Sequence, residues 1–421
     1  MARSRRLSSP HAIGAAVILC VIGALVAIAD GRSPSRPSLP QPETAPAVEV
    51  VFDRPSYAPG DRGVLVFWSD RSEELTMQIF RADRRLFRDD EMRGTPVTDA
   101  RRVRPRRARI TLRVGDWKSG LYYARVARSG RFGYAPFVLR SRPLGRHRVA
   151  VVLPTYTWQA YNFRDVDRDG VGDTWYASPD VHVVDLKRPY LNRGVPPKFR
   201  GYDAGFLAWL RREGHRADFL ADEDLETMRG ERLARLYDLI VFSGHEEYVT
   251  RHVFDQVERY RDLGGNLAFL SANNFFYRVE RRGRTLLGRT RWRDVGRHES
   301  RLIGVEYVDW HQERYENKPY VVTGTHRAPW LFRATGLVNG SRFGTYGIEI
   351  DARTRHSPPG TVVVARIPNI FGPGKTAEMT YYRTRNGAQV FAAGTLNFGG
   401  SALFPAPGAM LANLWEHLSR P

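Results

Sequence analysis

The chain almost lacks cysteine. Its 421 residues contain a single one, Cys20, within an apolar stretch near the amino terminus. The rest of the chain therefore has no thiol that could form a disulfide, hold zinc or attack a substrate carbonyl. Disulfide-stapled folds and cysteine-dependent amide transfer are excluded on this ground.

Acidic residues are in short supply. Against 45 aspartates and glutamates stand 65 lysines and arginines, which gives a formal net charge of +20. Arginines are dense in residues 101–107 and 278–301, but no nucleic-acid recognition motif accompanies them, so we expect no nucleic-acid partner. The sequence predicts either a solvated basic surface or attraction to anionic polymers of the cell envelope.

Long apolar runs are also scarce. Three arginines precede the run 12–29, which ends in the A-x-A pattern Ala27-Ile28-Ala29. Residues 1–29 are predicted to be a signal peptide that is removed on export. Because the run has the minimum length of a membrane span, an uncleaved anchor formed by residues 12–29 is the alternative, and membrane contact is expected only in that case. Since no second span follows, the remainder is predicted to be secreted or otherwise extracytoplasmic.

Two domains are predicted after a proline-rich linker at residues 30–47. Residues 48–142 show short alternating segments separated by turns, typical of an immunoglobulin-like β-sandwich. The expected strands are Val48–Phe52, Val64–Ser69, Leu75–Arg81, Arg109–Val114, Leu121–Arg128 and Gly133–Leu139.

From residue 143 to 421 the pattern changes to alternating strands and helices. The expected strands are Arg148–Leu153, Ala217–Leu220, Leu239–Phe242, Asn266–Leu270, Thr361–Ile367 and Gln389–Ala393. The expected helices are Gly205–Arg212, Leu225–Leu236, Arg251–Leu263 and Ala409–Leu418. This alternation predicts a Rossmann-like three-layer α/β domain, with a largely parallel sheet and ligands beyond the carboxyl ends of its strands.

Two polar segments follow such strand ends, PTYTWQAYN at 154–162 and SGHEEYV at 243–249. Alternation along an extended segment would place His245 and Glu247 on one side and Glu246 on the other. Buried charges need a cation, hydrogen bonds, a metal or water. The simpler alternative is capping and ion pairing at the start of the next helix.

An acidic loop follows the first of these segments. Its aspartates surround Gly170 at the spacing of a calcium-binding loop, but Tyr176 stands where an EF-hand has its last ligand. The sequence therefore predicts a truncated calcium site, or else an acidic surface turn. The predicted ligands are Asp165, Asp167, Asp169 and Asp173.

These motifs resemble those of a known family, the N,N-dimethylformamidase large (beta) subunits. The resemblance spans about residues 50–415 and is most specific at PTYTWQAYN, at FSGHEEY, at LSANN (270–274) and at the turn Trp117–Tyr122. It implies a sheet related to that of class I glutamine amidotransferases. The catalytic thiol of those enzymes has no counterpart here.

The resemblance also implies a mononuclear iron held by two tyrosines and one glutamate. Matched motif by motif, Glu247 takes the glutamate role and Tyr161 one tyrosine role. Tyr122 is the better match for the other tyrosine, with Tyr123 one residue away. His245 and Asn273 take the roles of a nearby histidine and asparagine. Phenolate and carboxylate oxygens are hard donors that suit ferric iron and leave coordination positions open.

The leading interpretation is an exported hydrolase of a small amide-like C–N bond, with iron as the Lewis acid. In this interpretation His245 transfers protons and Asn273 donates a hydrogen bond to the oxyanion. The main alternative is a non-catalytic, envelope-associated binding module with a structural calcium loop. A glycan hydrolase using Glu246 or Glu247 with an aspartate ranks last, because the sequence places no second carboxylate beside them.

Overall fold

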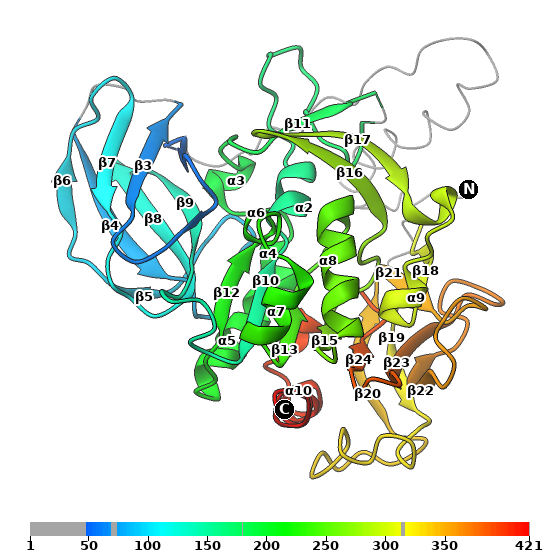
Figure 1. Cartoon of the computed structure of the whole chain (residues 1–421). Helices are drawn as coiled ribbons and strands as arrows, with labels where there is room; N and C mark the ends of the chain where they lie inside the picture. Colours follow the sequence, from blue (N-terminus) through cyan, green and yellow to red (C-terminus); the bar gives the residue numbers. More distant parts are fainter. Residues whose placement is uncertain (1–47, 69–73, 179, 313–315, 421) are drawn as a thin grey trace, which may run out of the picture.

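The structure is a computed structural model that describes residues 48–68, 74–178, 180–312 and 316–420 (Figure 1). The predicted signal peptide 1–29, the alternative anchor 12–29 and the linker 30–47 lie outside these residues. Among the residues described, no helix has the length and apolar character needed to cross a membrane.

The amino-terminal part consists of two antiparallel-rich sheets packed face to face (Figure 1). The smaller sheet contains β1 (Val50–Phe52), β3 (Arg62–Phe67) and β7 (Arg109–Arg113). The larger contains β2 (Ser56–Tyr57), β9 (Arg131–Leu139), β8 (Gly120–Arg128), β4 (Leu75–Arg81), β5 (Thr95–Pro96) and β6 (Arg101–Val103). The short strands β2, β5 and β6 were not predicted from the sequence. Alternate residues such as Leu65, Met77 and Phe137 fill the space between the sheets, as expected of strands with one buried face.

The second part is built on a nine-stranded sheet. Five parallel strands come first, in the order β12 (Asp218–Ala221), β10 (Val149–Leu153), β13 (Leu239–Phe242), β15 (Asn266–Phe269) and β24 (Gln389–Ala392). The antiparallel strands β23 (Ala377–Arg383), β22 (Val362–Ile367), β19 (Asn317–Val322) and β20 (Arg342–Gly347) extend it. The expectation of a largely parallel sheet therefore holds for its first half only. The predicted strand Thr361–Ile367 belongs to the antiparallel extension.

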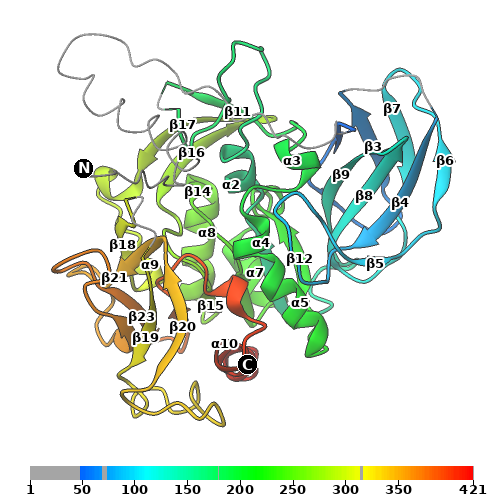
Figure 2. The ribbon, with the colours of Figure 1, turned by 180° about the vertical axis from the view of Figure 1, so that it is seen from behind.

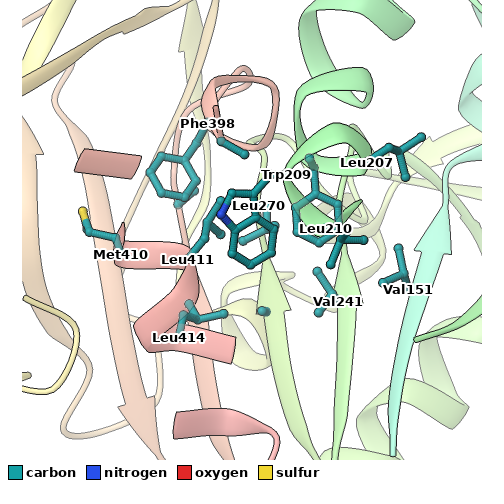
Figure 3. Packing of buried hydrophobic residues seen from close by; sticks show 14 of the residues in the cluster. Val151, Leu207, Trp209, Leu210, Val241, Leu270, Phe398, Met410, Leu411 and Leu414 are labelled. Atoms are coloured by element: carbon teal, nitrogen blue, oxygen red, sulfur yellow. The ribbon is translucent and has the colours of Figure 1, made fainter. Parts of the chain in front are cut away.

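Helices cover both faces of the parallel strands. Val151, Val241 and Leu270 pack with α5 (Ala204–Arg212) and α10 (Pro405–Leu418), where Trp209 lies among Leu411 and Leu414 (Figure 3). Neighbouring residues such as Val152 and Ile240 point to the other face and pack with α7 (Gly230–Leu236) and α8 (Arg251–Asp262). Burial on both faces explains why these strands are continuous apolar runs. The predicted helix Leu225–Leu236 is interrupted, because α6 (Asp222–Leu225) ends before Arg229, which is extended.

Shorter elements gather beyond the carboxyl ends of the parallel strands (Figure 2). They include α2 (Thr155–Ala160) after β10, a four-stranded sheet and a two-stranded one. The four-stranded sheet contains β11 (Val183–Asp185), β17 (Thr285–Arg291), β16 (Tyr277–Arg282) and β14 (Tyr248–Thr250). The two-stranded sheet pairs β18 (Glu306–Trp310) with β21 (Glu349–Ala352). The remaining short helices are α3 (Leu191–Gly194), α4 (Phe199–Tyr202), η2 (Trp292–Val295), α9 (Ser300–Ile303) and η3 (Gly399–Ser401).

Candidate functional site

The candidate site lies where the strand order reverses. β10 is flanked by β12 on one side and by β13 on the other, and such a reversal opens a crevice at the carboxyl ends of the strands. The segment after β10 forms α2, and the segment after β13 is the loop that contains His245. The Glu247 backbone N–H donates to the Thr157 hydroxyl at 3.0 Å, so the two segments are joined directly.

The centre of the site is the imidazole of His245, which is buried. Its Nε2 lies 3.0 Å from the Tyr161 hydroxyl oxygen, 3.2 Å from Glu247 Oε2 and 3.9 Å from Glu349 Oε2. Its Nδ1 lies 3.1 Å from the Ala272 carbonyl oxygen, to which it donates. This second contact fixes the ring, so that Nε2 faces three oxygen atoms from three different segments.

These contacts determine the protonation states of His245 and of the side chains around it. Burial opposes a charged ring, but the Glu247 side chain and the negative charge of Glu349 outweigh it and raise the pKa of His245 to about 9. Burial also raises the pKa of Glu349 to about 7, against the opposing effect of His245. Burial and the charge of Glu247 raise the pKa of Tyr161 well above its usual value. Without a bound cation, the site therefore holds an imidazolium and a neutral phenol at neutral pH.

Glu349 is the functional residue that the sequence reasoning missed. It lies on β21, and the Asn273 side chain hydrogen-bonds to it. Asp351, two residues further along the strand, accepts the Asn273 backbone N–H at 2.9 and 3.0 Å. One strand therefore supplies a carboxylate to the site and anchors the residue that contacts it. The alternation Glu349-Ile350-Asp351 is the signal that could have identified this strand.

Tyr122 does not join the other predicted ligands. Its side chain packs in the sandwich between Trp117 and Phe137, and its hydroxyl donates to the Lys118 carbonyl at 2.6 Å. Tyr123 lies on the opposite side of β8, where its hydroxyl donates to the Met92 carbonyl at 3.2 Å. The structure therefore brings neither Tyr122 nor Tyr123, the expected second tyrosine ligands, beside Tyr161 and Glu247. The reason is that β8 is an interior strand of the sandwich and directs both side chains into packed clusters.

Another tyrosine does reach the site. Tyr202, at the end of α4, lines the same pocket as Tyr161 and His245, and its ring centroid lies 6.2 Å from that of His245. Burial and the charge of Glu349 raise its pKa well above the usual value. The pocket is tight, with room for about one water molecule.

Several buried oxygen atoms of the site have few or no partners among the residues described. Asn273 Oδ1 forms no hydrogen bond there, and the only cationic group near Glu247 Oε2 and Glu349 Oε2 is His245 Nε2, at 3.2 and 3.9 Å. Buried acceptors of this kind are costly unless a proton or a cation satisfies them. Together with the Tyr161 oxygen, they are hard donors, which suit iron(III) or another hard cation.

Glu246 points to the other side of the loop, as alternation predicts. It lies against Asp222, which accepts the Tyr156 backbone N–H at 2.7 Å and the Thr155 hydroxyl at 2.9 Å. Burial and the Asp222 charge raise the pKa of Glu246 well above its usual value. A carboxyl pair is therefore present after all. Its two side chains are hydrogen-bonded to each other, which is closer than the separation of about 5 to 9.5 Å between the two carboxyl groups of a glycosidase.

The acidic loop brings three of its four predicted ligands together. Carboxylate oxygens of Asp165, Asp167 and Asp173 lie within 4.8 Å of one another. Asp169 is not part of this group, and its Oδ1 accepts the Val171 backbone N–H at 2.8 Å.

A buried guanidinium joins this loop to α2. Arg188 donates to the backbone carbonyls of Gln159 and Asp173, each at 2.6 Å, and to that of Arg164 at 3.2 Å. The acidic loop is thereby tied to the chain just before Tyr161.

Comparison with known proteins identifies the family of the chain. Residues 106–406 match the family described as N,N-dimethylformamidase beta subunit-like, C-terminal. The chain belongs to this family. The N,N-dimethylformamidase beta subunits of Alcaligenes sp and Paracoccus aminophilus are each 24% identical to it over 301 residues. These alignments cover 57% of this chain and 36% of each relative, so the chain matches only about a third of their length.

One solved structure gives a weaker match. The sulfur carrier protein SoxY from Chlorobium limicola f thiosulfatophilum is 15% identical, and the alignment covers 28% of this chain and 94% of SoxY. Its TM-score of 0.16 is too low to indicate a shared fold.

Proposed function

We propose that this protein is an exported hydrolase that cleaves the C–N bond of a small amide with the help of a bound iron ion. The observation that carries the proposal is the meeting of Tyr161, Glu247 and Glu349 around the buried Nε2 of His245. Family membership supports the reaction class. The reversed strand order supports assigning the second part as a Rossmann-like domain, and the two packed sheets support an immunoglobulin-like first part.

The metal would be held by Tyr161 and Glu247, with Tyr202 as the second tyrosine in place of Tyr122. Tyr202 is favoured because it lines the same pocket as Tyr161. A bound iron would supply Lewis acidity that polarises the amide carbonyl or acidifies a water molecule.

The chain's own groups supply the remaining chemistry. His245 Nε2 is placed to exchange a proton with the attacking water and the leaving amine, because Nδ1 is held by the Ala272 carbonyl. Asn273 positions Glu349 through its side-chain amide, in addition to the oxyanion-donor role expected from the resemblance. Thr157 fixes the Glu247 backbone. The tightness of the pocket beside His245 favours a small substrate.

The decisive experiment measures metal content and amide hydrolysis together. Protein purified with iron available should contain close to one iron per chain and release amine from small amides, N,N-dimethylformamide being the first to test. Glu247→Gln should lose the metal and the activity, because the anionic donor is removed while the shape is kept. Glu246→Gln is the matched control and should keep the metal. Wild-type protein that stays metal-free and inactive would contradict the proposal.

A group of arginines supports the second candidate, an envelope-binding module. Five arginines of β6, β7 and the segment between them are exposed and have no ion pair within the described parts of the chain. β6 and β7 lie on the side of the sandwich away from the α/β part (Figure 1). The five residues are Arg101, Arg104, Arg106, Arg107 and Arg109.

Such a cluster attracts anionic polymers in a salt-dependent manner. Replacing Arg104, Arg106 and Arg107 by glutamine should weaken binding to isolated anionic cell-wall polymer without affecting metal content. If the variant binds the polymer as tightly as the wild type at low salt, the envelope-binding function is contradicted.

A further inference from the structure

A second cavity lies between the sandwich and the α/β part. It is open to solvent, and its space, counted together with the solvent at its mouth, is about 750 Å³. Residues 50–55 and 136–138 form its sandwich wall, and α2, residues 186–190 and the turn between β16 and β17 form the opposite wall. Neither His245 nor Glu247 lines it, so this interdomain cleft is separate from the site described above.

The cleft carries more positive than negative charge. Four cationic and two acidic residues line it. Arg281 is held by Glu223 at 2.8 Å, whereas Arg284 approaches its nearest carboxylate, on Asp185, only to 3.8 Å. Lys187 forms no ion pair among the residues described. Burial and the adjacent charge of Arg284 lower the pKa of Lys187, against the smaller opposing effect of the carboxylates of Asp53, Glu223 and Asp185.

Apolar side chains surround these cations. Leu121 and Val138 come from the sandwich, and Trp158, Leu186 and Tyr190 come from the α/β part. Trp158 lines the pocket beside His245 as well, and its indole N–H donates to Asp203 at 3.3 Å. A ligand in the cleft would therefore pack on a residue whose position also shapes the active-site pocket.

We propose that the interdomain cleft binds a small organic carboxylate. The carboxylate pairs with Lys187, which has no ion pair among the residues described, and with Arg284, whose contact with Asp185 is long. The apolar body packs against Trp158 and Tyr190. A guanidinium fork beside an ammonium suits a planar carboxylate, and the apolar walls favour a ligand with a hydrocarbon body over a free inorganic anion. This inference does not depend on the proposed hydrolase activity.

Calorimetric titration of the purified protein with benzoate tests the inference. Benzamide is the neutral control of the same shape, and we expect saturable benzoate binding that is at least tenfold tighter than benzamide binding. Equal affinities, or no saturation by benzoate, would overturn it. A phenyl phosphate affinity more than tenfold above that of benzoate would overturn the carboxylate assignment in favour of a phosphate ligand.

Amino-acid substitutions test whether benzoate binds in the interdomain cleft. Lys187→Met should weaken benzoate binding at least fivefold, and Arg284→Gln should do so as well. Lys118→Met, which removes an exposed lysine of the sandwich, should leave it unchanged. Glu247→Gln should also keep the affinity, which distinguishes the cleft from the pocket beside His245. Benzoate binding that is lost in Glu247→Gln but kept in both Lys187→Met and Arg284→Gln would contradict the inference.

Discussion

His245 Nε2 and the Tyr161 hydroxyl oxygen lie 3.0 Å apart, although 84 positions separate the two residues in the sequence. Parallel pairing of β10 with β13 brings their carboxyl ends together, and each residue follows one of these ends. A buried contact between an imidazole and a phenol is thus a direct product of the strand order.

The second tyrosine ligand can be identified by colour. Phenolate bound to ferric iron gives a visible charge-transfer band. We expect Tyr161→Phe and Tyr202→Phe each to weaken or shift this band, because both tyrosines line the pocket. Tyr122→Phe should leave the spectrum unchanged and cost about 1 kcal/mol of unfolding free energy, since it removes only the hydrogen bond to Lys118. A spectrum altered by Tyr122→Phe but not by Tyr202→Phe would restore the original assignment.

His245 should be separable from metal binding. His245→Gln is expected to keep the iron and to lower kcat by about 100- to 10,000-fold, because the variant side chain cannot transfer a proton. Metal analysis and steady-state kinetics on the same preparation check this. Loss of iron in this variant would show that His245 is itself a ligand.

Unfolding of the metal-free protein should depend on pH through His245. The folded pKa is raised to about 9 from the usual 6.5. The stabilisation is therefore complete below pH 6.5 and is lost as the pH rises through 9. The total amounts to about 3 kcal/mol by the usual conversion. Denaturant unfolding between pH 6 and 10 should show this fall in the wild type and a much smaller one in His245→Gln. Parallel curves would contradict the raised pKa.

Calcium should stabilise the acidic loop. If Asp165, Asp167 and Asp173 hold the ion, added calcium should raise the melting temperature and a chelator should reverse the rise. The double variant Asp165→Asn, Asp167→Asn should abolish the response. Asp169→Asn should keep most of it, since this side chain is outside the group. Identical melting curves with calcium and with chelator would leave only an acidic turn.

Gly244 offers a test of the loop that carries His245. A Cβ atom at this position would lie 2.1 Å from Asp203 Oδ1 and 3.1 Å from Pro154 Cγ. Gly244→Ala should therefore displace the loop and lower activity strongly. Gly201→Ala, where an added Cβ meets nothing within 4 Å, should be neutral. Equal activity of the two variants would show that the loop tolerates the displacement.

The sequence was sufficient for parts of the structure that depend on local pattern. The strand Leu239–Phe242 and the opposite directions of Glu246 and Glu247 both follow from burial and alternation. Glu349 was harder to find in this way, because β21 is four residues long, its partner strand β18 is more than 35 positions away, and only the alternation Glu349-Ile350-Asp351 marks it in the sequence. Tyr122 was misplaced for a related reason. A matching motif fixes a residue's position along a strand, but the packing of the whole sandwich decides which cluster its side chain enters.

Arg188 is fully buried, and its guanidinium donates hydrogen bonds to carbonyl groups on both sides of the acidic loop and on α2. One side chain thus connects both ends of the loop to the end of α2, so a distortion of the loop also displaces the backbone next to Tyr161. Lysine, with a single donor centre, could not span three carbonyl groups. Binding of an ion to the acidic loop would therefore act on Tyr161 through Arg188, which is not one of the loop's carboxylates.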